Sequence, residues 1–341
     1  MKSRRLRSLP VLASVALASL TLSSCAAFSD DTASTVEDGG TPQVVAAFYP
    51  LEYVASRVAG DRADVSSLTA PGQEPHDLEL SVADNATVAG SDLVVLEGGL
   101  QAAVDYAVVQ NAPGEVLDVT DVVELTPLDE EHDLAEEEGH EGETAEEHAE
   151  HAGEGHEEDH EGHDHGDLGD LDPHFWLDPT LMADAGDAVA EAMAEVDPDG
   201  AEEYAAGAAD LRSDLEALDA DLQAGLASCE RDTIVVSHDA FGYLDRYGLD
   251  VEAVAGLSPD AEPNPADLGR LQELIATDGI TTVFSERLAS PALTESLARD
   301  AGVETAVLDP IEGLTEETAE EDYLSLMRSN LEALRAANGC S

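Results

Sequence analysis

Three histidines that lie far apart in the sequence each sit beside a Pro or an Asp near the end of a strand-like run. They are His76, His174 and His238. Imidazole nitrogens are common metal ligands, and three of them with a carboxylate suit a borderline divalent cation such as zinc. Manganese prefers sites with more oxygen ligands. A single histidine at a strand end is more often structural, but the same placement in three cases favours one buried metal site.

Carboxylates follow two other strand-like runs and are candidates for a fourth ligand. Asp309 directly follows one apolar run, and Glu286 follows another after a single serine. We expect Asp309 to be the ligand, with Glu286 either replacing it or accepting a hydrogen bond from a ligand. Glu74, two residues before His76, is expected either to approach the metal or to face solvent.

An acidic segment at residues 129–170 holds eight of the eleven histidines. Its composition cannot build a hydrophobic core, and it is typical of a disordered loop. Such histidines and carboxylates are expected to bind zinc weakly and to raise its concentration near the buried site. A passive, solubilising insertion is the alternative. The histidines are His132, His140, His148, His151, His156, His160, His163 and His165.

Apolar runs of strand length alternate with helical patterns through most of the chain. This alternation predicts βαβ units and parallel sheets, whose ligands bind beyond the carboxyl ends of the strands. The expected strands cover 44–48, 65–68, 93–96, 116–119, 233–236, 251–255, 281–284 and 305–308. The expected helices cover 51–58, 82–88, 102–109, 240–247, 265–277, 292–299 and 323–336.

The strand and helix pattern occurs twice, which predicts two α/β lobes at residues 43–180 and 229–341. The helical segment 181–228 lies between them, and its part 201–227 carries leucines at helical spacing. A helix of that length rises about 40 Å, enough to run along both lobes and join them rigidly. A plain surface helix within one domain fits the same periodicity. In the two-lobe arrangement the metal site lies in the cleft between the lobes.

The N-terminus has the features of an export signal. Residues 1–24 combine a basic start with a short apolar core that is short for a membrane span. Cys25 follows small residues at the processing point, which resembles the lipobox of bacterial lipoproteins and predicts a lipid anchor; an ordinary secretory peptide is the alternative. Residues 25–42 then form a flexible tether. The predicted location is extracytoplasmic, attached to the cell membrane.

The net charge limits the classes of binding partner, and the cysteine content limits the disulfides that can form. A formal net charge of −62 excludes nucleic acid, which requires clustered basic residues, and favours cations. An exported chain permits disulfides, so we expect Cys229 and Cys340 to pair and to attach the C-terminal helix to the start of the second lobe. Metal ligation by these cysteines is the less favoured alternative, because neither lies near the histidines.

The histidine motifs together resemble the cluster A-I solute-binding proteins of bacterial metal ABC importers. The resemblance rests on Pro75-His76-Asp77, on residues 172–179 (DPHFWLDP), on residues 237–243 (SHDAFGY) and on Leu308-Asp309-Pro310. It covers residues 43–340. It implies two α/β lobes joined by a long rigid helix, with the metal between them, and the matching ligands are His76, His174, His238 and Asp309.

The resemblance also implies a function. Manganese-binding members of this family usually place Glu where this chain has His238, and they lack a histidine-rich insertion. We therefore expect a monomeric, non-enzymatic protein that captures Zn²⁺ as its transported ligand and delivers it to an ABC permease. A manganese-binding homologue and a metal-binding adhesin are alternatives. A zinc hydrolase is less favoured, because the chain has no His-Glu-x-x-His motif and its ligands are scattered over both lobes.

Overall fold

Two parallel four-stranded sheets form the centres of two α/β lobes, as predicted. The computed structural model describes residues 40–128, 168, 169, 171–259, 261 and 263–341, and residues 41–341 form one compact unit. The strands are β1 (Gln43–Ala46), β2 (Asp64–Ser67), β3 (Leu93–Leu96), β4 (Glu115–Asp118), β5 (Thr233–Val236), β6 (Asp250–Ala253), β7 (Thr282–Ser285) and β8 (Glu304–Val307). The sheet orders are β2-β1-β3-β4 and β6-β5-β7-β8.

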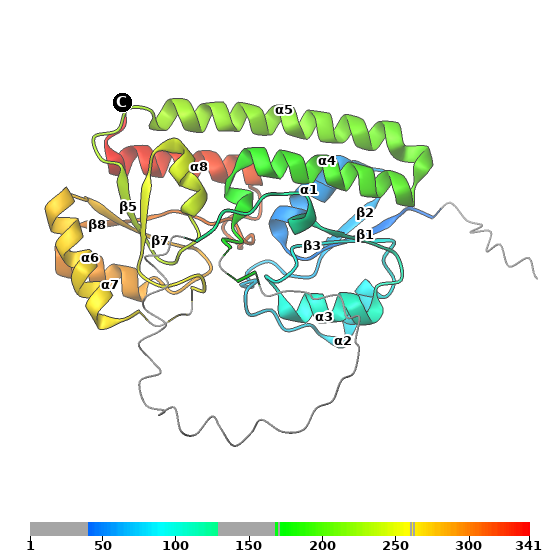
Figure 1. The fold of residues 1–341 in the computed structure, drawn as a ribbon, viewed down its shortest axis with the longest axis horizontal. Coiled ribbons are helices and arrows are strands. Elements are labelled where there is room, and N and C mark those ends of the chain that lie inside the picture. Colours follow the sequence, from blue (N-terminus) through cyan, green and yellow to red (C-terminus); the bar gives the residue numbers. More distant parts are fainter. Residues whose placement is uncertain (1–39, 129–167, 170, 260, 262) are drawn as a thin grey trace, which may run out of the picture. The chain divides into compact units, whose positions relative to one another are not determined.

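Helices surround both sheets (Figure 1). The α-helices are α1 (Tyr49–Ala59), α2 (Val82–Val88), α3 (Ala102–Asn111), α4 (Pro179–Val196), α5 (Ala201–Leu226), α6 (Pro265–Asp278), α7 (Ala292–Ala301) and α8 (Tyr323–Asn338). The short 3-10 helices are η1 (Val119–Asp121), η4 (Phe175–Leu177), η5 (Pro198–Gly200) and η6 (Gly242–Tyr247). The central strand β3 is buried along its whole length, which explains its continuous apolar sequence.

One predicted helix is shorter in the structure. Residues 240–247 were expected to form a helix, and the segment is the 3-10 helix η6, which begins only at Gly242. It is short, and Gly248 ends it with a left-handed backbone at a φ of 81°. A Cβ on Gly242 would lie 2.7 Å from an Asp172 carboxylate oxygen, so a side chain there would displace this carboxylate, which contacts His174.

The helix α5 connects the two lobes. It has 26 residues and is therefore about 39 Å long. It packs against α1 and α4 in the first lobe and against α8 in the second, and Figure 1 shows it running along both. The leucine face predicted from the sequence, including Leu211 and Leu218, is buried against these helices. At Gly207 the backbone of α5 approaches α1 so closely that an added Cβ would lie 2.6 Å from the Val58 carbonyl oxygen.

A disulfide joins Cys229, just before β5, to Cys340, just after α8. This is the pair expected from the sequence. It connects residues at a sequence separation of 111, so it closes most of the second lobe into one covalent loop. Among the helices of the described residues, none combines the length and apolar character that a membrane crossing requires.

Candidate metal centre

The three histidines predicted as ligands lie together in the structure. One ligand atom from each of His76, His174, His238 and Glu312 lies within 4.8 Å of all the others. The centroids of the three imidazole rings are 5.4 to 6.0 Å apart. Within the described part of the chain this is the one such group of His, Cys, Asp and Glu side chains. Sequence reasoning found the histidines and missed Glu312.

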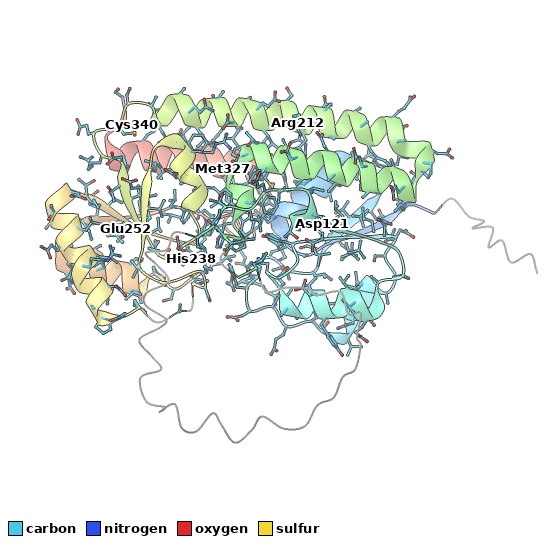
Figure 2. The ribbon with its side chains drawn as sticks, viewed as in Figure 1. Asp121, Arg212, His238, Glu252, Met327 and Cys340 are labelled. Atoms are coloured by element: carbon cyan, nitrogen blue, oxygen red, sulfur yellow. A yellow bond between two sulfur atoms is a disulfide. The ribbon has the colours of Figure 1, made fainter. Side chains whose placement is uncertain are left out.

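Segments that follow strands carry three of these residues, and the start of a short helix carries the fourth. His76 follows β2 and His174 directly precedes η4, whereas His238 follows β5 and Glu312 follows β8. Because the carboxyl ends of parallel strands meet at one edge of each sheet, residues distant in sequence converge there. In Figure 2 the labelled His238 lies on the side of its lobe that faces the first lobe. Each lobe therefore contributes two of the four side chains.

The separation of the four side chains suits a tetrahedral metal site. Oε1 of Glu312 lies 3.2 Å from Nε2 of His76. The same oxygen lies 3.5 Å from Nε2 of His238 and 3.7 Å from Nε2 of His174. Ligands bonded to zinc at about 2.0 to 2.1 Å in a tetrahedron lie roughly 3.3 Å from one another. The Glu312 oxygen thus already lies close to the spacing from each imidazole nitrogen that zinc coordination requires.

Two of the imidazoles are oriented by carboxylates at their other nitrogen. Nδ1 of His174 lies 2.7 Å from Oδ1 of Asp172, and Nδ1 of His238 lies 2.5 Å from Oε1 of Glu286. A carboxylate at Nδ1 fixes the ring and leaves Nε2 as the metal-binding atom. The Nε2 atoms of His174 and His238 are buried and have no hydrogen-bond partner. Two buried, unpartnered nitrogens are what a site built for a metal ion predicts.

Glu286 and Glu74 both contact histidines without belonging to the group of four. Glu286 orients His238 and also accepts a hydrogen bond from the Ser237 hydroxyl, which is the second of the two roles considered for it. Glu74 turns back on its own segment, where Oε1 accepts from the backbone N–H of His76 at 3.1 Å. Its Oε1 lies 4.0 Å from Nε2 of the same histidine.

Asp309, the expected fourth ligand, lies outside the group. Its Oδ1 accepts from the backbone N–H of Ile311 at 2.9 Å, and its Oδ2 lies 2.9 Å from Nε of Arg287. Both oxygens are therefore directed at other groups, and Glu312, three residues later in the same segment, takes the place among the imidazoles. The sequence signal for Glu312 was weak, because it does not directly follow a strand.

The carboxylates favour the charged form of two imidazoles in the metal-free protein. Burial disfavours a charged His238, but its contacts with Glu286 and Glu312 outweigh burial and raise its pKa to about 10. Burial also opposes protonation of His76, and Glu312 and Glu74 again raise its pKa above the usual value. The pKa of Glu312 is lowered despite burial, because His238 and His76 stabilise its charge. A proton on either imidazole would therefore compete with a metal ion for the same nitrogen.

The eight histidines of the acidic segment and the predicted lipidation site Cys25 lie outside the described residues. Their predicted roles stay predictions of the sequence.

Comparison with known proteins relates this geometry to a family. Residues 44–337 match the family model described as "Zinc-uptake complex component A periplasmic" (ZnuA). The chain belongs to this family. The zinc-binding lipoprotein AdcA of Streptococcus pneumoniae is 34% identical over 339 residues, which cover 94% of this chain and 60% of AdcA. The high-affinity zinc uptake system protein ZnuA of Bacillus subtilis is 30% identical, over 87% of this chain and 88% of that protein.

Solved structures agree with this family assignment. The crystal structure of Zn(II)-bound AdcA from Streptococcus pneumoniae matches with a TM-score of 0.67 and 30% identity, over 88% of this chain and 58% of that one. The Zn(II)-bound ZnuA-like domain of the same protein matches with a TM-score of 0.67 over 88% of this chain and 99% of the domain. This member of the ZnuA family thus spans about 60% of the length of the AdcA relatives, and corresponds to their ZnuA-like domain.

Proposed function

We propose that this protein is the zinc-binding component of a metal uptake system. The observation that carries the proposal is the buried group of three imidazole nitrogens and one carboxylate oxygen, all within 4.8 Å of one another. His76, His174, His238 and Glu312 would hold the ion. Nitrogen-rich, four-coordinate sites favour zinc, whereas manganese prefers more oxygen ligands. The names of the AdcA and ZnuA relatives, which describe zinc binding and zinc uptake, support the same conclusion.

Burial favours transport of the ion over catalysis with it. His174 and His238 are 0% exposed and Glu312 is 1% exposed, so three of the four groups are almost completely shielded from solvent. A catalytic zinc keeps one position open for water or substrate, whereas here four protein side chains each offer a ligand atom within 4.8 Å of the others. The zinc hydrolase alternative has no support from this arrangement. Capture and later release of the ion needs no further group.

The route of the ion is also proposed. Cys25 would anchor the mature protein to the outer face of the cell membrane, and an ABC permease would receive the zinc from the lobes. The acidic segment 129–170 would collect zinc weakly and exchange it with the buried site. The very acidic composition supports a cation as the cargo.

A competitive zinc titration against a chromophoric chelator tests the proposal. The protein is the chain from Ala26 onward, compared with His238→Ala and with a deletion of residues 130–170. We expect one tight zinc equivalent that survives the deletion and is lost in His238→Ala, while weak equivalents disappear with the deletion. Tighter manganese than zinc binding, or a tight site that persists in His238→Ala, would overturn the proposal.

A matched pair of variants tests the fourth ligand. Glu312→Gln and Asp309→Asn each replace one buried carboxylate with an amide of the same shape, three residues apart. Only the first removes a carboxylate charge from among the imidazoles. Zinc affinity should therefore fall much further in Glu312→Gln. A larger loss in Asp309→Asn would return the ligand assignment to Asp309.

A further inference from the structure

Ile311, the residue before Glu312, has a strained backbone. Its φ is 61°, and among the described residues it is the one non-glycine residue with a positive φ. The left-handed region costs an L-residue roughly 1 to 2 kcal/mol, and a β-branched residue is a clear outlier there. Ile311 is also completely buried, so its side chain cannot turn toward solvent. Strain of this kind persists only where surrounding contacts impose it, and it clusters at functional sites.

Contacts from the second lobe hold the residues just before Ile311. Oδ1 of Asp309 accepts from the Ile311 N–H at 2.9 Å. The Asn330 side chain, from α8, bonds both backbone groups of Asp309: its Oδ1 accepts from the N–H at 2.9 Å and its Nδ2 donates to the carbonyl oxygen at 2.6 Å. The start of this turn is therefore fixed to its own lobe.

Contacts from the first lobe hold the same turn from the other side. The indole Nε1 of Trp176, in the segment leading into α4, donates to the Pro310 carbonyl oxygen at 2.7 Å. The backbone N–H of Gly72 donates to the carbonyl oxygen of Leu314, also at 2.7 Å. These two bonds bracket Ile311 and Glu312, and both cross from one lobe to the other. The turn that contains Ile311 is thus held by contacts from both lobes.

We propose that Ile311 is a strained positioning residue that directs Glu312 onto the three imidazoles and favours release of the divalent cation when the lobes separate. In the closed protein the left-handed backbone points the Glu312 carboxylate into the site. Once the bonds from Trp176 and Gly72 break, Ile311 relaxes to an extended backbone and withdraws the carboxylate. This inference rests on the proposed function, because it concerns release from the same site.

The test compares Ile311→Ala with Ile311→Gly in the chain from Ala26 onward. Both variants lose the buried side chain and leave nearly the same cavity, but only glycine adopts a positive φ without strain. Zinc is the probe, and its dissociation is followed after mixing with excess chelator. We expect dissociation about 5- to 30-fold slower from Ile311→Gly than from Ile311→Ala, the ratio that corresponds to the cost of the left-handed backbone. Association rates of the two variants should agree closely.

Equal dissociation rates in the two variants would overturn the proposal, since the strain would then be the same with and without the metal. Faster dissociation from Ile311→Gly would overturn it as well. If the cavity prevents Ile311→Gly from folding, Ile311→Asn takes its place, because asparagine tolerates a positive φ. This variant should also release zinc more slowly than Ile311→Ala. Absence of tight zinc binding in the unmodified chain is a different result, which would refute the proposed function itself.

Discussion

Zinc affinity should depend steeply on pH above neutrality, because zinc must displace a proton from His238. The Nδ1 of this buried imidazole lies 2.5 Å from Glu286 and its Nε2 lies 3.5 Å from Glu312, which raises its pKa to about 10. While the imidazole is protonated, each pH unit changes the apparent affinity about tenfold, or about 1.4 kcal/mol. Between pH 6 and 8 we therefore expect a rise of at least about 100-fold, with His76 adding to it.

The window from pH 7.5 to 8.5 separates this expectation from ordinary histidine behaviour. Imidazoles with a pKa near 6.5 would be neutral there, and affinity would hardly change. Calorimetric zinc titration with a competing chelator, in two buffers of different ionisation enthalpy, measures both the affinity and the number of protons released. A flat affinity in this window without proton release would refute the electrostatic argument.

Two variants test whether Glu286 contributes to the steep pH dependence of zinc affinity. Glu286→Gln removes one carboxylate that raises the pKa of His238, so the pH dependence should become shallower. The affinity of the site with neutral imidazoles should fall by about 10- to 100-fold, because the ring loses the acceptor that orients it. Glu317→Gln makes the same chemical change at a side chain that is 85% exposed and lies 3.6 Å from Arg287. This control should keep the steep dependence of the unmodified protein.

Three further outcomes follow from the same contacts. Asp172→Asn should weaken zinc binding about 10- to 100-fold in chelator competition, because a ligand imidazole loses its charged acceptor; unchanged affinity would contradict this role. Replacing Cys229 and Cys340 with serine should lower the free energy of unfolding in urea by about 2 to 5 kcal/mol, and equal stability would contradict it. The raised pKa of His238 gives the metal-free protein stability that is complete below pH 6.5 and disappears as pH rises through about 10. The lowered pKa of Glu312 gives stability that is present above pH 4.5 and is lost as pH falls. The difference in the free energy of unfolding between the unmodified protein and Glu312→Gln, measured in urea, should therefore become smaller between pH 6.5 and 10. A difference that stays constant over this range would contradict the argument.

Much of the fold was predictable because it depends on local pattern. Apolar runs such as residues 93–96 form strands buried on both faces, and the leucines of α5 form its buried face, so neighbouring residues carry the signal. The helix expected at residues 240–247 is the shorter 3-10 helix Gly242–Tyr247. Its limits depend on Gly248 and on the close approach of Gly242 to Asp172, a contact between residues far apart in the sequence.

The histidines of the site were predictable for a related reason. Each lies near a strand or short helix in its own stretch of sequence, and the parallel sheets bring such positions to a common edge. The carboxylates that complete the site were harder to predict from the sequence. Glu286 was considered both as a ligand and as the acceptor for a histidine, and only its contact with Nδ1 of His238 favours the second role.

The sequence by itself determined that this chain has two parallel α/β lobes and brings His76, His174 and His238 to one site, because strand patterns and the residues at strand ends are local properties. Only the tertiary structure decided which carboxylate joins them. Asp309 and Glu312 share one segment, and the choice depends on an arginine from another strand end and on the left-handed backbone of Ile311. The tertiary structure also sets the pKa values of His76 and His238, because a pKa depends on charges and burial that come together only when both lobes are in place.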